Sequence, residues 1–273
     1  MPAAARNSLH IVIFFLLLLA TACASRPPKP DEEKALPYLS EQEEIKFGNY
    51  VDAVVASQYP TLKDEHLTEQ VAAIGNQLVA VSARPTLPFT FKVLNTSEVN
   101  AFAGPGGFVY VTVGLLDMLE KKDELASVLA HEIGHVCERH SVRSYYNAQK
   151  MQNVLTLFDI AAMVAGIPPV ASVGGDMVGD FSRIVANLTA MIIAQGYSRS
   201  WETKADELAL SYCSRADYDP HSFVTVLERF RTMEEEKGEK VKITLLSSHP
   251  QTEDRIKHIQ SLIDRTETDE TDN

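Results

Sequence analysis

The sequence has few cysteines, few basic residues and no run of about 20 uninterrupted apolar residues. Three cysteines in 273 residues are too few for a disulfide scaffold. With 37 acidic and 25 basic residues the net charge is -12, which argues against a nucleic-acid-binding protein, because such a protein carries a basic patch. A hydrophobic content of 45% is ordinary for a globular protein and excludes a disordered or collagen-like chain. The lack of long apolar runs excludes a multi-span membrane protein.

Four segments differ in composition. Residues 1–22 contain the apolar run Leu9–Ala20, which is too short to span a bilayer and is typical of an export signal. Residues 23–39 are rich in proline and charge and predict an extended tether. Residues 40–263 carry the helix and strand patterns and predict a single domain. The acidic tail 264–273 has no apolar residue and is expected to be disordered.

Small residues precede Cys23, as in the lipobox of bacterial lipoproteins, although Ala20 stands where leucine is usual. We therefore expect Cys23 to carry a lipid anchor. The alternative is a plain secretory signal that is cleaved near Ala22 or Ala24. Ala24 is not the aspartate that typically retains such lipoproteins in the inner membrane. By that analogy the protein is an outer-membrane lipoprotein of the bacterial cell envelope that faces the periplasm.

Helix and strand patterns alternate along the domain, without a repeat of fixed period. Ser40 and Glu43 form a capping box, which predicts the start of a helix. Apolar residues at helical spacing predict a core-facing helix from Asp123 onward: Leu125, Val128, Leu129, Ile133 and Val136. Further helices are expected near 64–82 and 200–216, and strands near 88–95 and 108–114.

An HExxH motif lies inside the helix expected from Asp123. A spacing of four places His131 and His135 on one helix face, about one turn apart, so that both imidazoles can reach one metal ion. Neutral imidazole is a good zinc ligand. Glu132 lies one step around the helix, where its carboxylate can accept a proton from a water that the metal activates. The motif predicts a hydrolytic zinc site.

A catalytic zinc ion needs a third protein ligand. The metzincin pattern requires glycine and histidine where this chain has Glu138 and Ser141, so that arrangement fails. His140 is one place out of that pattern and is interpreted as a surface histidine. A glutamate from a later helix is the other arrangement. Glu202 and Asp206 share a helix face, which suits one metal ligand and one carboxylate that holds a ligand histidine, although a solvated acidic face remains an alternative.

Five segments resemble the signature blocks of the HtpX/Oma-type gluzincin metallopeptidases and are most similar to the minigluzincins and the bacterial periplasmic lipoprotein members. They are NAFAGPGGFVYVTVGLL, ELASVLAHEIGHVCERHS, YSRSWETKADELAL, RADYDP and SSHPQTEDRI. The resemblance covers residues 40–263. It implies an α+β fold, a mostly helical zincin domain with a small antiparallel sheet whose edge strand lines the zinc cleft.

The resemblance also implies roles for the residues of the motifs. His131, His135 and Glu202 would bind one zinc ion per chain, and Glu132 would be the general base. Asp206 would orient a ligand histidine.

Two further blocks contribute by the same resemblance. The edge strand beside the cleft would bind an extended polypeptide through Asn100, Ala101, Phe102 and Ala103. His249, followed by Arg255, belongs to a block that approaches the zinc. His249 would either stabilise the oxyanion of the reaction or occupy the fourth zinc position and hold the enzyme inactive; a helix-capping histidine is the structural alternative.

Two features leave alternatives open. The apolar stretch Val154–Ile193 is interrupted by charges and prolines, so we expect core or lid helices, with a lid that touches membrane or client as the second interpretation. Cys137 and Cys213 remain after lipidation of Cys23. A disulfide between them is compatible with the periplasm, but spacing does not place them in contact.

The expected function is that of a zinc endopeptidase that cleaves unfolded or misassembled proteins at the periplasmic face of the outer membrane. The rival is an outer-membrane protein assembly factor or chaperone with a latent protease site. A purely structural zinc site is disfavoured, since such sites are usually rich in cysteine. The expected partners are polypeptide substrates, the membrane through the lipid anchor, and the outer-membrane assembly machinery, with no nucleic acid.

Overall fold

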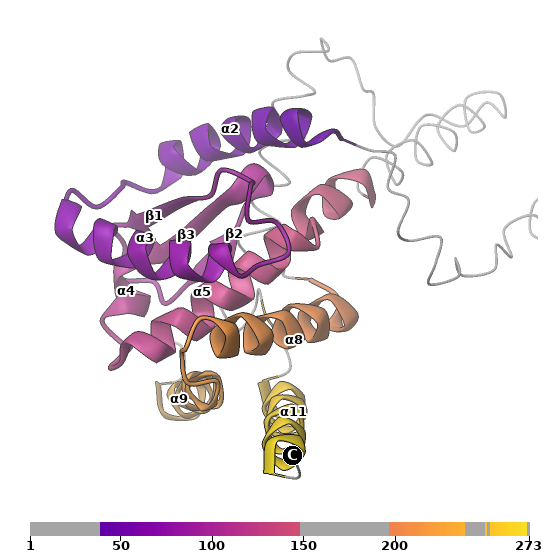
Figure 1. The fold of residues 1–273 in the computed structure, drawn as a ribbon. Coiled ribbons are helices and arrows are strands. Elements are labelled where there is room, and N and C mark those ends of the chain that lie inside the picture. The colour runs from indigo at the N-terminus through magenta and orange to yellow at the C-terminus, as the bar shows by residue number, and fades with distance from the viewer. Residues whose placement is uncertain (1–38, 148–196, 238–248, 250–251, 272–273) are drawn as a thin grey trace, which may run out of the picture. The chain divides into compact units, whose positions relative to one another are not determined.

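The computed structural model describes residues 39–147, 197–237, 249 and 252–271. The predicted export signal, Cys23, most of the predicted tether and the apolar stretch Val154–Ile193 lie outside the described residues. Figure 1 shows some of the described helices beside a small sheet and others away from it, and the predominance of helices confirms an α+β, mostly helical fold. Within the described part of the chain, no helix is long and apolar enough to cross a membrane.

Local sequence signals start the first two helices. The helix α2, Glu41–Gln58, begins at Ser40, whose hydroxyl accepts from the Glu43 amide while the Glu43 carboxylate accepts from the Ser40 amide. This confirms the predicted capping box. The helix α3, Glu65–Ala80, begins at Asp64, whose carboxylate accepts from a backbone N–H of the first turn. Both caps satisfy amides that a helix start leaves without partners.

Three short strands form a mixed sheet in the order β1-β3-β2. The strand β1, Thr90–Leu94, pairs parallel with β3, Phe108–Thr112, and β2, Ala101–Ala103, pairs antiparallel with β3. The prediction of an antiparallel sheet is wrong for β1 and β3. They run parallel because the chain reverses twice between them, once before β2 and once after it. β2 lies at an edge of the sheet, as expected.

The sheet separates two apolar layers. The side chains that face α2 are Phe102, Phe108 and Tyr110, which pack with Phe47, Val51 and Val55 of that helix. The side chains that face α3 and the HExxH helix are Phe91, Val93, Ala101, Ala103, Val109 and Val111. Alternate residues of a strand point to opposite faces, so a three-stranded sheet serves both layers.

The remaining helices carry the candidate site. The short helix α4, Val113–Leu116, follows β3, and α5, Lys122–Cys137, contains the HExxH motif. The helix α8, Arg199–Arg215, packs along α5, and α9, His221–Lys237, and α11, Thr252–Thr271, pack against these two (Figure 1). Four of the five apolar residues predicted on one face of α5 are buried: Val128, Leu129, Ile133 and Val136. The fifth, Leu125, is partly buried.

A glycine sets the distance between α5 and α8. A Cβ atom at Gly134 would lie 3.2 Å from the carbonyl oxygen of Ala205, tighter than ordinary van der Waals contact. Glycine at this position of the HExxH motif therefore lets the two backbones approach closely.

The helix α11 extends to Thr271 and so includes most of the tail 264–273, which was expected to be disordered. Ile259 and Ile263 are buried and hold the preceding turns of the helix in the core. The Thr268 hydroxyl donates to main-chain carbonyls of the preceding turn. Adding residues to an anchored helix is far less costly than starting one, so a polar segment without apolar residues can continue it.

Cys137 and Cys213 are both free thiols. The Cys213 thiol lies beside Ser127, and burial, its largest influence, raises its pKa to about 12. Ser127 and Cys137 are ten residues apart on α5, a separation of roughly 15 Å at 1.5 Å per residue. The cysteines are therefore too far apart for the disulfide that the sequence left open.

The turn between β2 and β3 is tied to α2. It is a 3-10 turn, Pro105–Gly107, in which Gly106 has φ 73° and donates its N–H to the buried Glu44 carboxylate of α2. A Cβ atom at Gly106 would lie 2.8 Å from the Ile45 Cα. Both the positive φ and the close backbone require glycine here.

We predict that Gly106→Ala lowers the free energy of unfolding by about 1–3 kcal/mol, measured by urea denaturation, because alanine is strained at positive φ and meets the α2 backbone. Gly104→Ala is the matched control. A Cβ at Gly104 would meet its nearest atom, the Phe108 Cβ, at 3.5 Å, so this change should be almost neutral. Equal stabilities of the two variants would contradict the strain at Gly106.

Candidate metal centre

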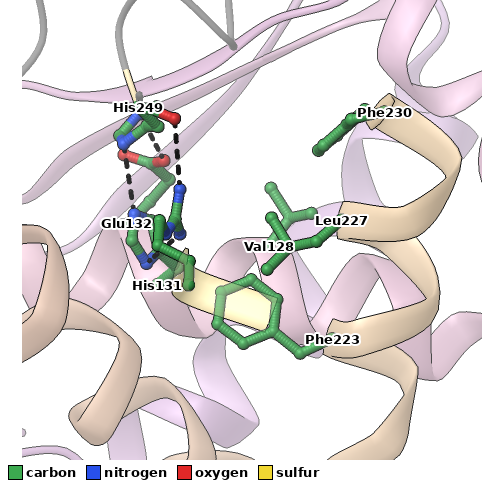
Figure 2. Close-up of a pocket in the computed structure, with 8 residues that line it drawn as sticks. Val128, His131, Glu132, Phe223, Leu227, Phe230 and His249 are labelled. Atoms are coloured by element: carbon green, nitrogen blue, oxygen red, sulfur yellow. Dashed lines mark hydrogen bonds and ion pairs between the residues drawn. The ribbon is translucent and has the colours of Figure 1, made fainter. Parts of the chain in front are cut away.

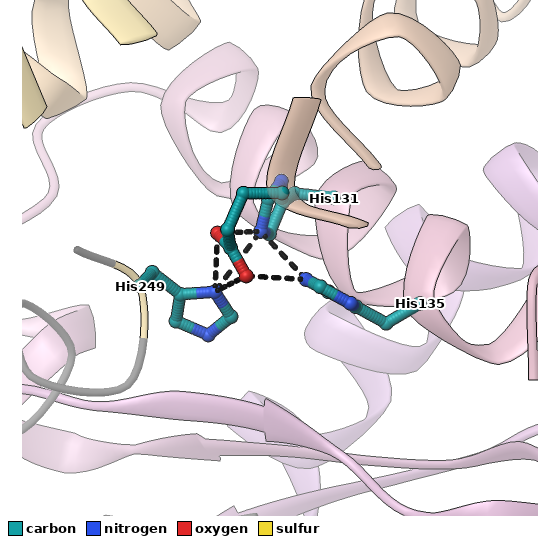
Figure 3. A group of neighbouring side chains, drawn as sticks. His131, His135 and His249 are labelled. Atoms are coloured by element: carbon teal, nitrogen blue, oxygen red, sulfur yellow. Dashed lines mark hydrogen bonds and ion pairs between the residues drawn. The ribbon is translucent and has the colours of Figure 1, made fainter. Parts of the chain in front are cut away.

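Four buried side chains from three parts of the chain point at one another (Figure 3). His131 and His135 lie one turn apart on α5, Glu202 lies in the first turn of α8, and His249 lies just before α11. Their ligand atoms all lie within 4.8 Å of one another. The structure therefore brings the three predicted metal ligands together and adds His249.

The distances within this group are short. The Nε2 atoms of His131 and His135 are 3.0 Å apart, and the carboxylate of Glu202 lies 3.5 Å from each of them. The Nδ1 atom of His249 is 2.9 Å from Glu202 Oε2 and 3.2 Å from His131 Nε2. Three imidazole nitrogens and one carboxylate oxygen are donors that zinc prefers, so these residues fit the predicted ion.

The first histidine is held by a carboxylate and an arginine. Asp206 Oδ1 lies 2.9 Å from His131 Nδ1, which leaves His131 Nε2 to face the other ligands. Arg255 donates to both oxygens of Asp206, at 2.7 and 2.9 Å. Burial opposes ionisation of Asp206, but Arg255 and the hydrogen bond with His131 outweigh it and lower its pKa. Asp206 thus contacts a predicted ligand histidine, and Arg255 contacts Asp206.

The second histidine is held by His140, which the sequence analysis interpreted as a surface residue. That interpretation is wrong, because His140 is fully buried and its Nδ1 lies 2.7 Å from the Nδ1 of His135. The left-handed backbone of Arg139, with φ 56°, turns the chain at the end of α5 and brings His140 back. Burial lowers the pKa of His140 to about 3, so it is neutral.

Glu132 differs from the other carboxylates of the site. It is buried, and neither of its oxygens has a hydrogen-bond partner among the described residues. The Nε2 of His249 lies 3.4 Å from Glu132 Oε1. Burial raises the pKa of Glu132, whereas the pKa of Glu202 is held well below its usual range because His249 and His131 outweigh the effect of burial. Glu132 is the carboxylate suited to accept a proton.

A small pocket adjoins Glu132 and His249. Figure 2 shows apolar side chains on one side of it and Glu132, His131 and His249 on the other. The apolar wall comes from α5 and α9: Val128, Phe223, Leu227 and Phe230. The pocket therefore offers an apolar surface directly beside the group that can take a proton.

The edge-strand residues Asn100, Ala101, Phe102 and Ala103 are buried in this structure, and their role in substrate binding stays a prediction. The carbonyl of Ala103 accepts a hydrogen bond from the Ser141 hydroxyl at 3.0 Å. The same hydroxyl lies 3.0 Å from the Tyr197 hydroxyl, and the Tyr197 ring stacks on His135 with ring centres 4.3 Å apart. These contacts connect the edge strand to a predicted metal ligand.

Two residues around the second histidine, Tyr197 and Trp201, had no predicted role, and His140 was wrongly predicted to lie at the surface. Trp201 immediately precedes Glu202, and its ring stacks on that of His140. The five-residue step from His135 to His140 does not match the period of a helix, so helical periodicity in the sequence does not predict the contact between these two histidines. An aromatic residue next to an expected metal ligand was the one local signal that could have identified Trp201.

The chain is similar to known metallopeptidases. The model of Peptidase family M48 matches residues 65–263. The chain is 30% identical over 214 residues to the mitochondrial metalloendopeptidase OMA1 of Schizosaccharomyces pombe, covering 78% of this chain and 56% of that protein. It is 28% identical over 218 residues to the beta-barrel assembly-enhancing protease of Escherichia coli, covering 80% of this chain and 43% of that protein.

A third relative, the metalloprotease YcaL of Escherichia coli, is 26% identical over 220 residues, covering 81% of this chain and 76% of that protein. The chain spans about half the length of the first two relatives.

We predict that Asp206→Asn weakens zinc binding by about tenfold or more and lowers the free energy of unfolding by about 3 kcal/mol, because the buried Arg255 loses the closer of its two carboxylate partners, Asp206 and Glu202. Chelator competition and urea denaturation would measure the two effects. Glu207→Gln is the control: the neighbouring carboxylate is exposed and pairs with Lys204 at the surface, so both quantities should barely change. Unchanged zinc affinity in Asp206→Asn would show that this carboxylate does not hold His131.

Proposed function

Because this chain belongs to peptidase family M48, a family of metalloproteases, we propose that it is a zinc-dependent endopeptidase that cleaves unfolded or misassembled proteins at the periplasmic face of the outer membrane. Glu132 supports this proposal most directly. It is a buried carboxylate without a hydrogen-bond partner among the described residues, and it adjoins a group of zinc-type donors. A structural metal site has no need of such a group.

The residues of the site have separate roles in peptide hydrolysis. Zinc, when bound, supplies a Lewis acid that polarises a carbonyl and lowers the pKa of water. Glu132 takes the proton of the attacking water and later passes it to the leaving amine. Its raised pKa suits both steps, since the group must gain and release a proton near neutral pH. Asp206 and Arg255 hold His131 in place throughout.

The pocket beside Glu132 supports an unfolded polypeptide as substrate. Its lining of Val128, Phe223, Leu227 and Phe230 places an apolar surface next to the bond that is cut. Folded proteins bury most apolar side chains, whereas unfolded or misassembled ones expose them.

Envelope location is supported by the export signal and Cys23 in the sequence and by the name of the bacterial beta-barrel assembly-enhancing relatives. A lipid on Cys23 would hold the enzyme at the membrane, near the outer-membrane assembly machinery.

His249 supports a second candidate, an assembly factor or chaperone for outer-membrane proteins with a latent protease site. Its Nδ1 lies among the donor atoms of the other three residues, 2.9 Å from Glu202 and 3.2 Å from His131. A catalytic zinc site keeps one position open for substrate, and four protein donors would close it. Of the two roles that the sequence left open for His249, this geometry favours the inhibitory one.

We predict that Glu132→Gln keeps one zinc per chain but lowers casein cleavage by about 10²–10⁴-fold, since the amide cannot accept the proton. Glu138→Gln is the control, because Glu138 is partly exposed at the end of α5 and pairs with Arg143. A chelator should abolish cleavage by the unaltered protein, and added zinc should restore it. Zinc bound without any cleavage would favour the client-binding alternative, and absence of zinc would contradict the ligand assignment.

We predict that His249→Ala raises casein cleavage, with zinc still held by the other three ligands. The cleavage rate should rise about tenfold for each 1.4 kcal/mol by which the site with His249 on the zinc is more stable than the site with that position open. His66→Ala is the control, since His66 lies on the exposed side of α3, bonded to Gln70. Slower cleavage at unchanged zinc content would instead assign His249 to stabilising the oxyanion.

A further inference from the structure

We propose that His140 is a positioning residue for the metal centre: its Nδ1 accepts the Nδ1 proton of His135 and thereby keeps the Nε2 of His135 free to bind the metal ion. This inference rests on the proposed metalloprotease site. It assigns a role to a histidine outside the ligand set, and it explains why His140 is buried beside the HExxH helix together with His131, His135 and His249.

The proton positions follow from the geometry. A neutral imidazole carries one N–H and has one acceptor nitrogen. The Nε2 of His135 faces the Nε2 of His131 at 3.0 Å and the carboxylate of Glu202 at 3.5 Å, so it is the nitrogen for the metal. The ring proton of neutral His135 then resides on its Nδ1, which lies 2.7 Å from the Nδ1 of His140. His140 must therefore accept, and its own proton resides on Nε2. The opposite assignment would place a proton on the metal-binding nitrogen of His135.

Aromatic packing holds His140 in this orientation. Its ring lies parallel to that of Trp201, with centres 4.7 Å apart and an angle of 3° between the planes. Tyr197 stacks on His135 itself. The Nε2 of His140 has no hydrogen-bond partner among the described residues, so the contact with His135 is the hydrogen bond that the described structure provides for this ring.

The two ligand histidines thus have partners of different charge. His131 is held by the carboxylate of Asp206, and carboxylates and carbonyls are the usual partners of metal-binding histidines. The site already buries Glu132, Glu202 and Asp206, and among the described residues Arg255 pairs with Glu202 and Asp206 but not with Glu132. A further carboxylate at position 140 would add like charge in a region of low dielectric. A neutral histidine supplies the acceptor without that charge.

Three variants separate the hydrogen bond from the packing. His140→Asn keeps an acceptor, because its side-chain oxygen occupies the place of Nδ1, but it loses the ring. His140→Phe keeps a ring on Trp201 and loses the acceptor, and His140→Leu loses both. The zinc dissociation constant of the complete purified protein would be measured by chelator competition, and thermal unfolding without zinc would show which variants fold.

We expect His140→Phe and His140→Leu to weaken zinc binding about 10–100-fold and His140→Asn to stay within about threefold of the unaltered protein. A role in packing alone reverses the order, with His140→Phe binding tightly and His140→Asn weakly, and would overturn the inference. Equal affinities in all variants would overturn it as well. If the unaltered protein binds no zinc, the proposed function itself fails, which this design distinguishes from failure at His140. Should His140→Leu not fold, the comparison of His140→Asn with His140→Phe decides the question.

Discussion

The close crossing of α5 and α8 at Gly134 is the constraint on which the candidate site depends. α5 supplies His131 and His135, and α8 supplies Glu202, so the ligand atoms converge only if the two backbones lie nearly in contact. A Cβ atom at Gly134 would meet the Ala205 main chain at 3.2–3.3 Å, so the two backbones would have to separate by a few tenths of an ångström. Glycine at this position therefore helps the two helices to approach closely enough for their ligand atoms to meet.

Burial and one arginine divide the acidic residues of the site into two kinds. Arg255 contacts Asp206 at 2.7 Å and Glu202 at 3.4 Å, and both of these carboxyl groups have lowered pKa values. Glu132 has no hydrogen-bond donor among the described residues, and burial raises its pKa. Carboxylates that would bind or orient the metal remain ionised, whereas the one beside the apolar pocket can take a proton. Different surroundings thus give the same functional group different roles.

The turn after α5 connects the site to the rest of the domain. Arg139 pairs with the buried Glu44 of α2 at 3.0 Å and donates to the Leu39 carbonyl at 2.6 Å. Its positive φ places the next two residues, His140 and Ser141, against a ligand histidine and the edge strand. The left-handed residue Arg139 and the two residues after it therefore make contacts with α2, the sheet and the metal centre.

The sequence by itself determined the elements that depend on nearby residues. The four-residue spacing of His131 and His135 places them on one helix face, and Ser40 with Glu43 starts a helix, because both effects act within about one turn. Tertiary structure alone decided the parallel pairing of β1 with β3, the burial of His140, the approach of His249 Nδ1 to Glu202 and the extension of α11 into a polar tail. Each of these depends on residues distant in the chain or on a turn that breaks the helical period, so packing of the whole domain sets them rather than local hydrogen bonding.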